Sequence, residues 1–172
     1  MRKSDLSWIG ILRVGHDWAT TTQREAAGVL EPDAFAFEAT VAVRWSDADS
    51  TGAINDARLV TLMEEARVAW LLSVGAQYRP LITSAMIVTV GIRFRRRLTH
   101  RDGPVRIGMW IDGHRSVDFV IGYEIRAGGD PAGSAPAATA TTQMAVVDIE
   151  KHTLRRLTSE EKGHLAAWSR SG

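Results

Sequence analysis

The chain has 172 residues, a length that suits one globular domain with a substantial core and is rather short for two. Apolar residues make up 45% and charged residues 24%, as in most folded proteins, and the formal net charge of +1 gives no overall field that would attract nucleic acid or an anionic membrane. The lack of cysteine excludes disulfides, thiolate nucleophiles and thiolate metal sites.

The first 34 residues show no sustained hydrophobic period. We expect residues 1–34 to be an extension, mobile or docked, on a domain formed by residues 35–172. Charged residues such as Asp5 and Arg13 interrupt the apolar run that a secretory signal needs, and no later stretch has the roughly 20 apolar residues of a membrane-spanning helix. We therefore expect a cytoplasmic protein without membrane or nucleic-acid partners.

The alternation of apolar and polar residues from Phe37 to Trp45 predicts a strand with one buried face. The residues that share this face are Phe37, Ala39, Val41, Val43 and Trp45. The next segment, 46–55, is rich in Asp, Ser, Thr and Gly, and this composition predicts a loop that leads into a helix with Asn55 or Asp56 as its N-cap.

The predicted helix ends at Gly75, and beyond Val68 it is apolar on all sides, so we expect that end to be deeply buried. The apolar stripe consists of Leu59, Leu62, Met63, Ala66 and Trp70, and the polar face of Arg58, Thr61, Glu64, Glu65 and Arg67.

Four more strands follow, separated by turns or loops. They are expected from Met86 to Phe94, Val105 to Ile111, Val117 to Ile125 and Ala138 to Asp148, before a terminal helix over 159–168 capped by Thr158 or Ser159. One strand, a long buried helix and then four strands predict an α+β fold, with an antiparallel five-stranded sheet around one long central helix.

Asp49 is the candidate catalytic residue because it lies in the loop just before the helix. Backbone N–H groups at a helix N-terminus can stabilise a developing oxyanion, and a carboxylate beside them can act as nucleophile or general base. The alternative is that Asp47 and Asp49 only hydrogen-bond their own loop, as loop aspartates often do. For Asp47 we expect only this structural role.

The run RWSDADSTGAIND, from Arg44 to Asp56, resembles the 4-hydroxybenzoyl-CoA thioesterase family, as does the order of elements over roughly residues 37–157. The resemblance implies a hotdog fold and hydrolysis of an acyl-CoA to a free acid and CoA. It gives Asp49 the role of nucleophile or general base, and the backbone N–H of Asp56 that of oxyanion donor, although capping is the alternative for the Asp56 side chain. It also implies a homodimer or tetramer with active sites at the interface.

Relatives often carry a histidine between positions 53 and 56, where this chain has Ala53, Ile54, Asn55 and Asp56. Losing that histidine removes one assisting group. The alternative is therefore a non-catalytic hotdog domain that binds acyl-CoA or an acyl carrier. A hydratase of the same fold would need the missing histidine as its base.

Arginines are densest at Arg93, Arg95, Arg96 and Arg97. Arg115 and Ser116 lie in the next hairpin turn, after Ile111, where related enzymes contact the CoA nucleotide. We expect Arg95, Arg97, Arg115 and Ser116 to bind CoA phosphates, because guanidinium groups stay ionised and offer paired donors. A solvated strand face is the alternative. The five histidines lack metal-site spacing, so we expect no metal, and CoA enters only as part of the substrate.

Overall fold

The computed structural model describes residues 35–131 and 133–170, so the predicted extension of residues 1–34 lies outside the described part. Its main sheet is antiparallel with the strand order β1-β3-β4-β5-β2, and the predicted five-stranded α+β fold is confirmed. The strands are β1 (Phe37–Val41), β2 (Ala85–Phe94), β3 (Val105–His114), β4 (Asp118–Ala127) and β5 (Ala138–Asp148), and a short β6 (Thr153–Leu154) pairs with β5.

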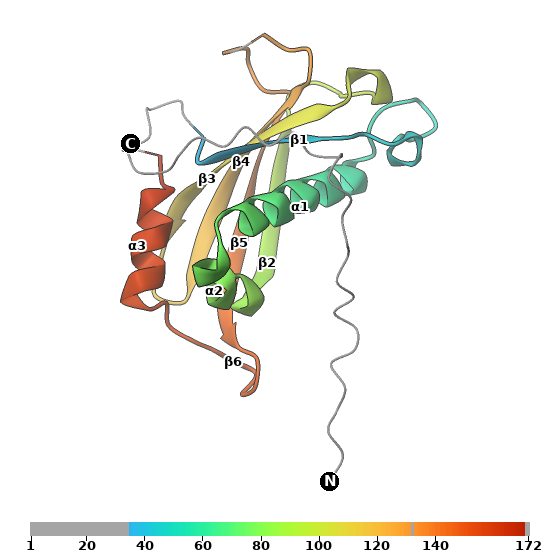
Figure 1. Ribbon diagram of the computed structural model, residues 1–172. Coiled ribbons are helices and arrows are strands. Elements are labelled where there is room, and N and C mark those ends of the chain that lie inside the picture. Colours follow the sequence, from blue (N-terminus) through green and yellow to red (C-terminus); the bar gives the residue numbers. More distant parts are fainter. Residues whose placement is uncertain (1–34, 132, 171–172) are drawn as a thin grey trace.

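Three helices lie on one side of the sheet (Figure 1). They are α1 (Asp56–Ser73), α2 (Arg79–Ser84) and α3 (Ser159–Ala167). The long helix α1 crosses the sheet and buries the predicted stripe from Leu59 to Trp70. The expected deep burial of its C-terminal end is wrong, because Val68 is 44% and Leu72 72% exposed. Helix α2 was not predicted, because six residues are too few to display a helical period. None of these helices in the described residues is long and apolar enough to cross a membrane.

Helix α1 begins where a side chain caps it. The Asn55 side-chain oxygen accepts a hydrogen bond from the backbone N–H of Ala57 at 2.9 Å, so Asn55 is the N-cap and Asp56 is the first helical residue. Asn55 is thus confirmed as the N-cap, and the alternative prediction of Asp56 as the N-cap is wrong. The helix ends at Ser73, just before Gly75, whose φ of 95° favours glycine and cannot continue a helix.

The predicted first strand is too long at its C-terminal end. Strand β1 stops at Val41, and Trp45 is 80% exposed instead of buried. The physical reason is the 3-10 turn Trp45–Asp47, in which the buried Asp47 carboxylate accepts the backbone N–H of Arg44 at 2.7 Å. Once the chain turns, the two-residue alternation no longer assigns side chains to faces of the sheet.

Strand β2 is an edge strand whose apolar side chains are exposed on both faces. These side chains are Met86, Ile87, Val88, Val90 and Phe94. The strand pairs with β5 on one side only, with a register shift between Ile87 and Thr89. An apolar strand with one free edge is a surface on which another strand can pair.

Candidate active site

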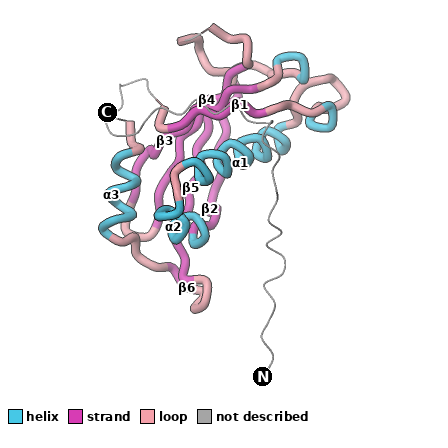
Figure 2. Tube along the Cα trace, viewed as in Figure 1, coloured by secondary structure: helices cyan, strands magenta, loops and turns pink. Residues whose placement is uncertain are grey.

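The loop between β1 and α1 lies at the end of the sheet where the β4–β5 loop also lies (Figure 2). The backbone closes this loop, since Asp49 N–H donates to the Ala53 carbonyl at 2.7 Å and Asn55 N–H to the Asp47 carbonyl at 2.9 Å. The segment after β2 holds it from outside, because Ile54 N–H donates to the Leu98 carbonyl at 2.7 Å. The loop is therefore fixed relative to both α1 and the sheet.

Asp49 uses its two carboxylate oxygens differently. Its Oδ1 accepts hydrogen bonds from the Thr51 N–H at 2.8 Å, the Thr51 hydroxyl at 2.6 Å and the Ala53 N–H at 3.1 Å. No group of the described residues donates to Oδ2. Both interpretations of the sequence thus fit this residue, because one oxygen shapes the loop and the other is available for chemistry.

The hydrogen bonds also decide the charge of Asp49. The Thr51 hydroxyl is the main cause that lowers the pKa of this carboxyl, followed by the N–H groups of Thr51 and Ala53 and the charge of Arg97. Arg97 lies close by, since its Nη1 donates to the Thr51 hydroxyl at 3.3 Å. Asp49 is accordingly ionised at neutral pH.

The neighbouring aspartates have different surroundings. Asp47 is buried and bonded to the chain that precedes it, as the expected structural role requires. Asp56 is exposed, and its carboxylate has no hydrogen bond or ion pair with the described residues. The Asn55 side chain accepts a hydrogen bond from the N–H of Ala57, while no described group accepts one from the N–H of Asp56. That N–H remains available as an oxyanion donor.

The structure places the predicted CoA-binding residues at two opposite ends of the sheet. Arg95 and Arg97 follow the end of β2, on the same side as the Asp49 loop. Arg115 and Ser116 lie in the β3–β4 turn, which the pairing of β4, β5 and β2 places level with the start of β2. Ten residues of strand, about 30 Å, separate the two pairs.

Arg115, and Arg96 between Arg95 and Arg97, already pair with carboxylates of the protein. Arg115 Nε lies 3.1 Å from Asp118 Oδ1 in an exposed ion pair, and Arg96 pairs with Asp130. Arg95 and Ser116 are exposed, and their side chains have no hydrogen bond within the described residues.

An apolar cavity of about 410 Å³ lies between the second half of α1, α2, α3 and the sheet. Arg67 lines it although it is only 6% exposed, and it donates to the buried Tyr123 hydroxyl at 3.4 Å. Its Nη2 lies 3.6 Å from Glu64, a side chain that is largely in solvent. The prediction that Arg67 lies on the polar face of the helix is therefore wrong. The position of Arg67 four residues after Met63 and three before Trp70 was the signal for the buried stripe.

Within the described residues, no group of three or more His, Asp or Glu side chains is placed to hold a metal ion.

The chain is similar to known proteins both in sequence pattern and in fold. The sequence pattern of the thioesterase-like superfamily matches residues 43–168. No curated protein matches the chain by sequence.

Solved structures of thioesterases share the fold. A Thermus thermophilus thioesterase complexed with coenzyme A and zinc superposes with a TM-score of 0.68 at 16% identity, covering 81% of this chain and 98% of that one. A probable thioesterase from Escherichia coli gives 0.65 at 18% identity, with 76% and 97% covered. A 1,4-dihydroxy-2-naphthoyl-CoA thioesterase from Synechocystis gives 0.59 at 16%, with 76% and 93% covered. At these identities the likeness establishes the fold alone.

The hydroxyl of Thr51 can be tested as the main cause of the low Asp49 pKa. In Thr51→Ala the pKa of Asp49 should rise, because the hydroxyl no longer stabilises the charged form. On acidification, the Asp49 carboxylate of the variant would then become protonated at a higher pH than that of the parent. A ¹³C NMR titration of the Asp49 carboxyl measures this, and Thr51→Ser, which keeps the hydroxyl, serves as the control. An identical titration in parent and Thr51→Ala would exclude the assigned cause.

Proposed function

The chain belongs to the thioesterase-like superfamily and has its hotdog fold, and we propose that it hydrolyses an acyl-CoA thioester with Asp49 as its catalytic carboxylate. The observation that carries the proposal is the state of Asp49. It is ionised, its Oδ2 accepts no hydrogen bond from the described residues, and its loop leads directly into the N-terminus of α1. This combination supplies a carboxylate and an oxyanion donor for acyl transfer.

In the proposed reaction Asp49 acts on the thioester carbonyl in one of two ways. As general base it takes a proton from water, and the hydroxide adds to the carbonyl carbon. As nucleophile its Oδ2 adds instead, and water then hydrolyses the resulting anhydride. In both, the backbone N–H of Asp56 faces the oxyanion, the C–S bond breaks, and the CoA thiolate leaves and is protonated.

The substrate class is inferred from the family and from the names of its relatives. One structure of the same fold is described as a complex with coenzyme A, and another as a thioesterase for an aromatic acyl-CoA. We extend the CoA thioester to this chain as a proposal and leave the acyl group open. The cytoplasmic location stays a prediction.

We further propose that two subunits pair through β2 into a homodimer, which can double to a tetramer. Support comes from the free edge of β2 and the apolar side chains exposed on both of its faces. Two-fold pairing would continue the sheet through both subunits and place the two α1 helices antiparallel on the same face.

Such a dimer gives each Asp49 an acyl pocket. The Asp49 loop lies at the end of β2, whereas Met86 and Ile87, at its start, line the 410 Å³ cavity. Antiparallel pairing brings the end of one β2 beside the start of the other. The cavity of one subunit would then open toward the partner subunit's Asp49, and a monomer would have an incomplete site.

The same pairing reunites the expected CoA-binding residues. Arg95 and Arg97 at the end of one β2 would approach Arg115 and Ser116 of the partner subunit, which are level with the start of β2. We propose that these four residues bind the phosphates of CoA across the interface.

Replacing the catalytic carboxylate tests the central proposal. Asp49→Asn should lower turnover of an acyl-CoA by at least about a hundredfold, because an amide can neither attack nor take up a proton effectively. The amide oxygen still accepts the loop hydrogen bonds, so the melting temperature should stay close to that of the parent. Thiol release is the measurement, and Glu150→Gln, an exposed carboxylate that follows β5 in the chain, is the matched control.

Near-normal turnover by Asp49→Asn would remove Asp49 from the mechanism. A parent protein that binds acyl-CoA but releases no thiol would instead favour the non-catalytic binding module.

A charge at the edge of β2 tests the dimer. Val88→Lys should give a monomer in sedimentation velocity and abolish turnover, because it places a charge in the proposed strand pairing. Val88 is skipped in the register between β2 and β5, so the change disturbs the subunit itself very little. Ile149→Lys, an equally exposed apolar position outside β2, should remain dimeric. A fully active Val88→Lys dimer would rule out this interface.

The phosphate contacts have a kinetic signature. Arg95→Ala and Arg115→Ala should raise KM for acyl-CoA and leave kcat largely intact, because contacts remote from the thioester hold ground state and transition state alike. Arg97 is a less clean probe, since it also contacts Thr51. An acyl-pantetheine, which lacks the nucleotide, should respond to neither change. Unaltered KM values for acyl-CoA in both variants would place the nucleotide elsewhere.

A further inference from the structure

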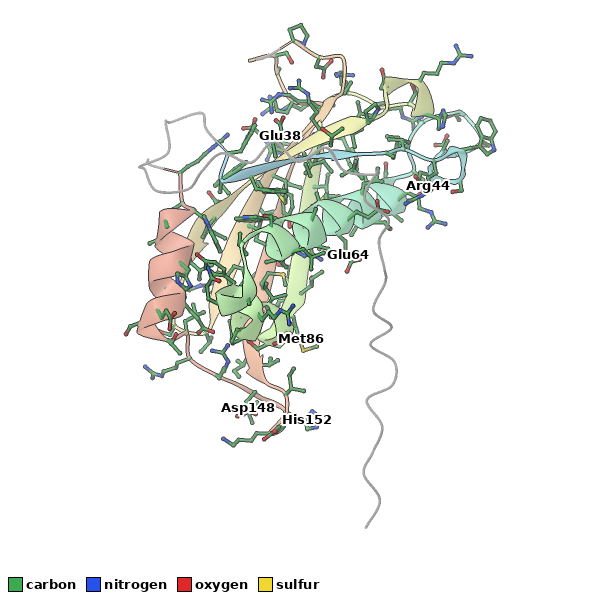
Figure 3. All side chains as sticks on the ribbon, viewed as in Figure 1. Glu38, Arg44, Glu64, Met86, Asp148 and His152 are labelled. Carbon is green, nitrogen blue, oxygen red and sulfur yellow. The ribbon has the colours of Figure 1, made fainter. Side chains whose placement is uncertain are left out.

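A second cavity, of about 400 Å³, lies on the outer face of the sheet, opposite α1. Alternation along the strands produces this face, because the neighbours of Arg106 and Arg126 point into the core. Figure 3 shows Glu38 on this side of β1, away from α1. The cavity is lined by Phe35, Glu38, Arg106, Glu124, Arg126 and Arg170, together with loop residues 133–136.

The charges in this cavity do not balance. Arg106 and Arg126 stand directly opposite each other in the pairing of β3 and β4, an arrangement of like charges that destabilises a sheet. Arg170 adds a third guanidinium, against the two carboxylates of Glu38 and Glu124. One positive charge is left over.

The carboxylates are also unevenly shared. Glu124 pairs with Arg126 at 2.6 Å and with Arg170 at 3.1 Å, so it serves two arginines. Glu38 approaches Arg106 only to 3.9 Å. Arg106 thus has the weakest carboxylate partner of the three, and its Nη2 instead donates to the Asp130 carbonyl at 2.7 Å.

Three hydrogen-bonding atoms of the lining are buried and have no partner among the described residues. They are Arg106 Nε, Arg170 Nε and Ser134 Oγ. A buried donor without a partner costs free energy, and native proteins contain few of them. Three such atoms belong to residues that line one cavity with excess positive charge, and this combination matches an acceptor with several oxygen atoms.

The arginines are also held in place before any ligand arrives. The Arg170 guanidinium lies 3.9 Å from the centre of the Trp110 ring and 5.0 Å from that of Phe35. Arg126 Nε donates to the Ser134 carbonyl at 3.0 Å. Fixed guanidinium forks lose little freedom when they bind an oxyanion.

We propose that this cavity is an oxyanion-binding site for a small molecule with a phosphate or carboxylate group, separate from the site of Asp49. The oxyanion accepts hydrogen bonds from Arg106 and Arg170, and the Ser134 hydroxyl provides a further contact. It supplies the negative charge that the three arginines lack.

Isothermal titration calorimetry of the full chain at constant ionic strength tests the site, with inorganic phosphate and succinate as separate probes. Saturable binding of one ion per chain is expected for at least one probe, and the stronger one identifies the group. Arg106→Gln and Ser134→Ala should weaken that binding, the former at least tenfold. Arg156→Gln, an exposed arginine outside the cavity, should bind as the parent does and controls for general charge and salt effects.

Thermal unfolding gives a second readout that does not depend on enzymatic activity. The bound probe should raise the melting temperature of the parent and of Arg156→Gln, and raise it less in the two cavity variants. Lack of saturable binding by both probes overturns the proposal. So does equal binding by the parent and a folded cavity variant. Since Ser134→Ala removes only a hydroxyl, it decides the question if Arg106→Gln does not fold.

Discussion

The packing of α1 on the sheet is the contact on which the rest of the structure depends. Leu62, Met63 and Ala66 are almost completely buried there, and this burial fixes the axis of the helix against β1 and β3. Because the axis of α1 is fixed, the positions of both ends of the helix are fixed as well. The N-terminal end carries the Asn55 cap and the Asp49 loop, and the other end forms a wall of the apolar cavity.

The site at the N-terminal end is made mainly by backbone. Loop residues 47–55 bond to one another and to the segment after β2, so the position of Asp49 depends little on any single side chain. Thr51 and Asp47 are the exceptions, because the Thr51 hydroxyl bonds to the Asp49 carboxylate and the Asp47 carboxylate holds the turn at the start of the loop. A loop of this kind can keep its shape while the residues around it change, which fits a fold shared at only 16–18% identity with the thioesterases compared above.

The charged groups divide between the two faces of the sheet. On the helix side, Arg67 is a single buried cation in an apolar cavity, with a hydroxyl and a distant carboxylate as its partners. On the outer face, three arginines share two carboxylates around a polar cavity. Both arrangements cost folding free energy, and such costs are common at the binding sites of proteins.

Much of the fold could be predicted from the sequence, because short-range patterns encode it. The last strand, predicted from Ala138 to Asp148, has the bounds of β5, Gly75 marks the end of α1 to within two residues, and Thr158 caps α3 as predicted. The aspartate motif gave the family and directed attention to Asp49. These features depend on neighbouring residues, whose relative positions the backbone period already determines.

The tertiary structure decided the features that depend on which surfaces meet. Trp45 continues an apolar alternation yet is exposed, because the buried Asp47 turns the chain before it. Arg67 is polar yet buried, because the second half of α1 faces a cavity. Arg97 and Arg115 are 18 positions apart in the sequence and lie at opposite ends of the sheet, because β3 runs its full length between them. Sequence periodicity determined which way each side chain points along its own element, and only the packing of elements determined what it meets there.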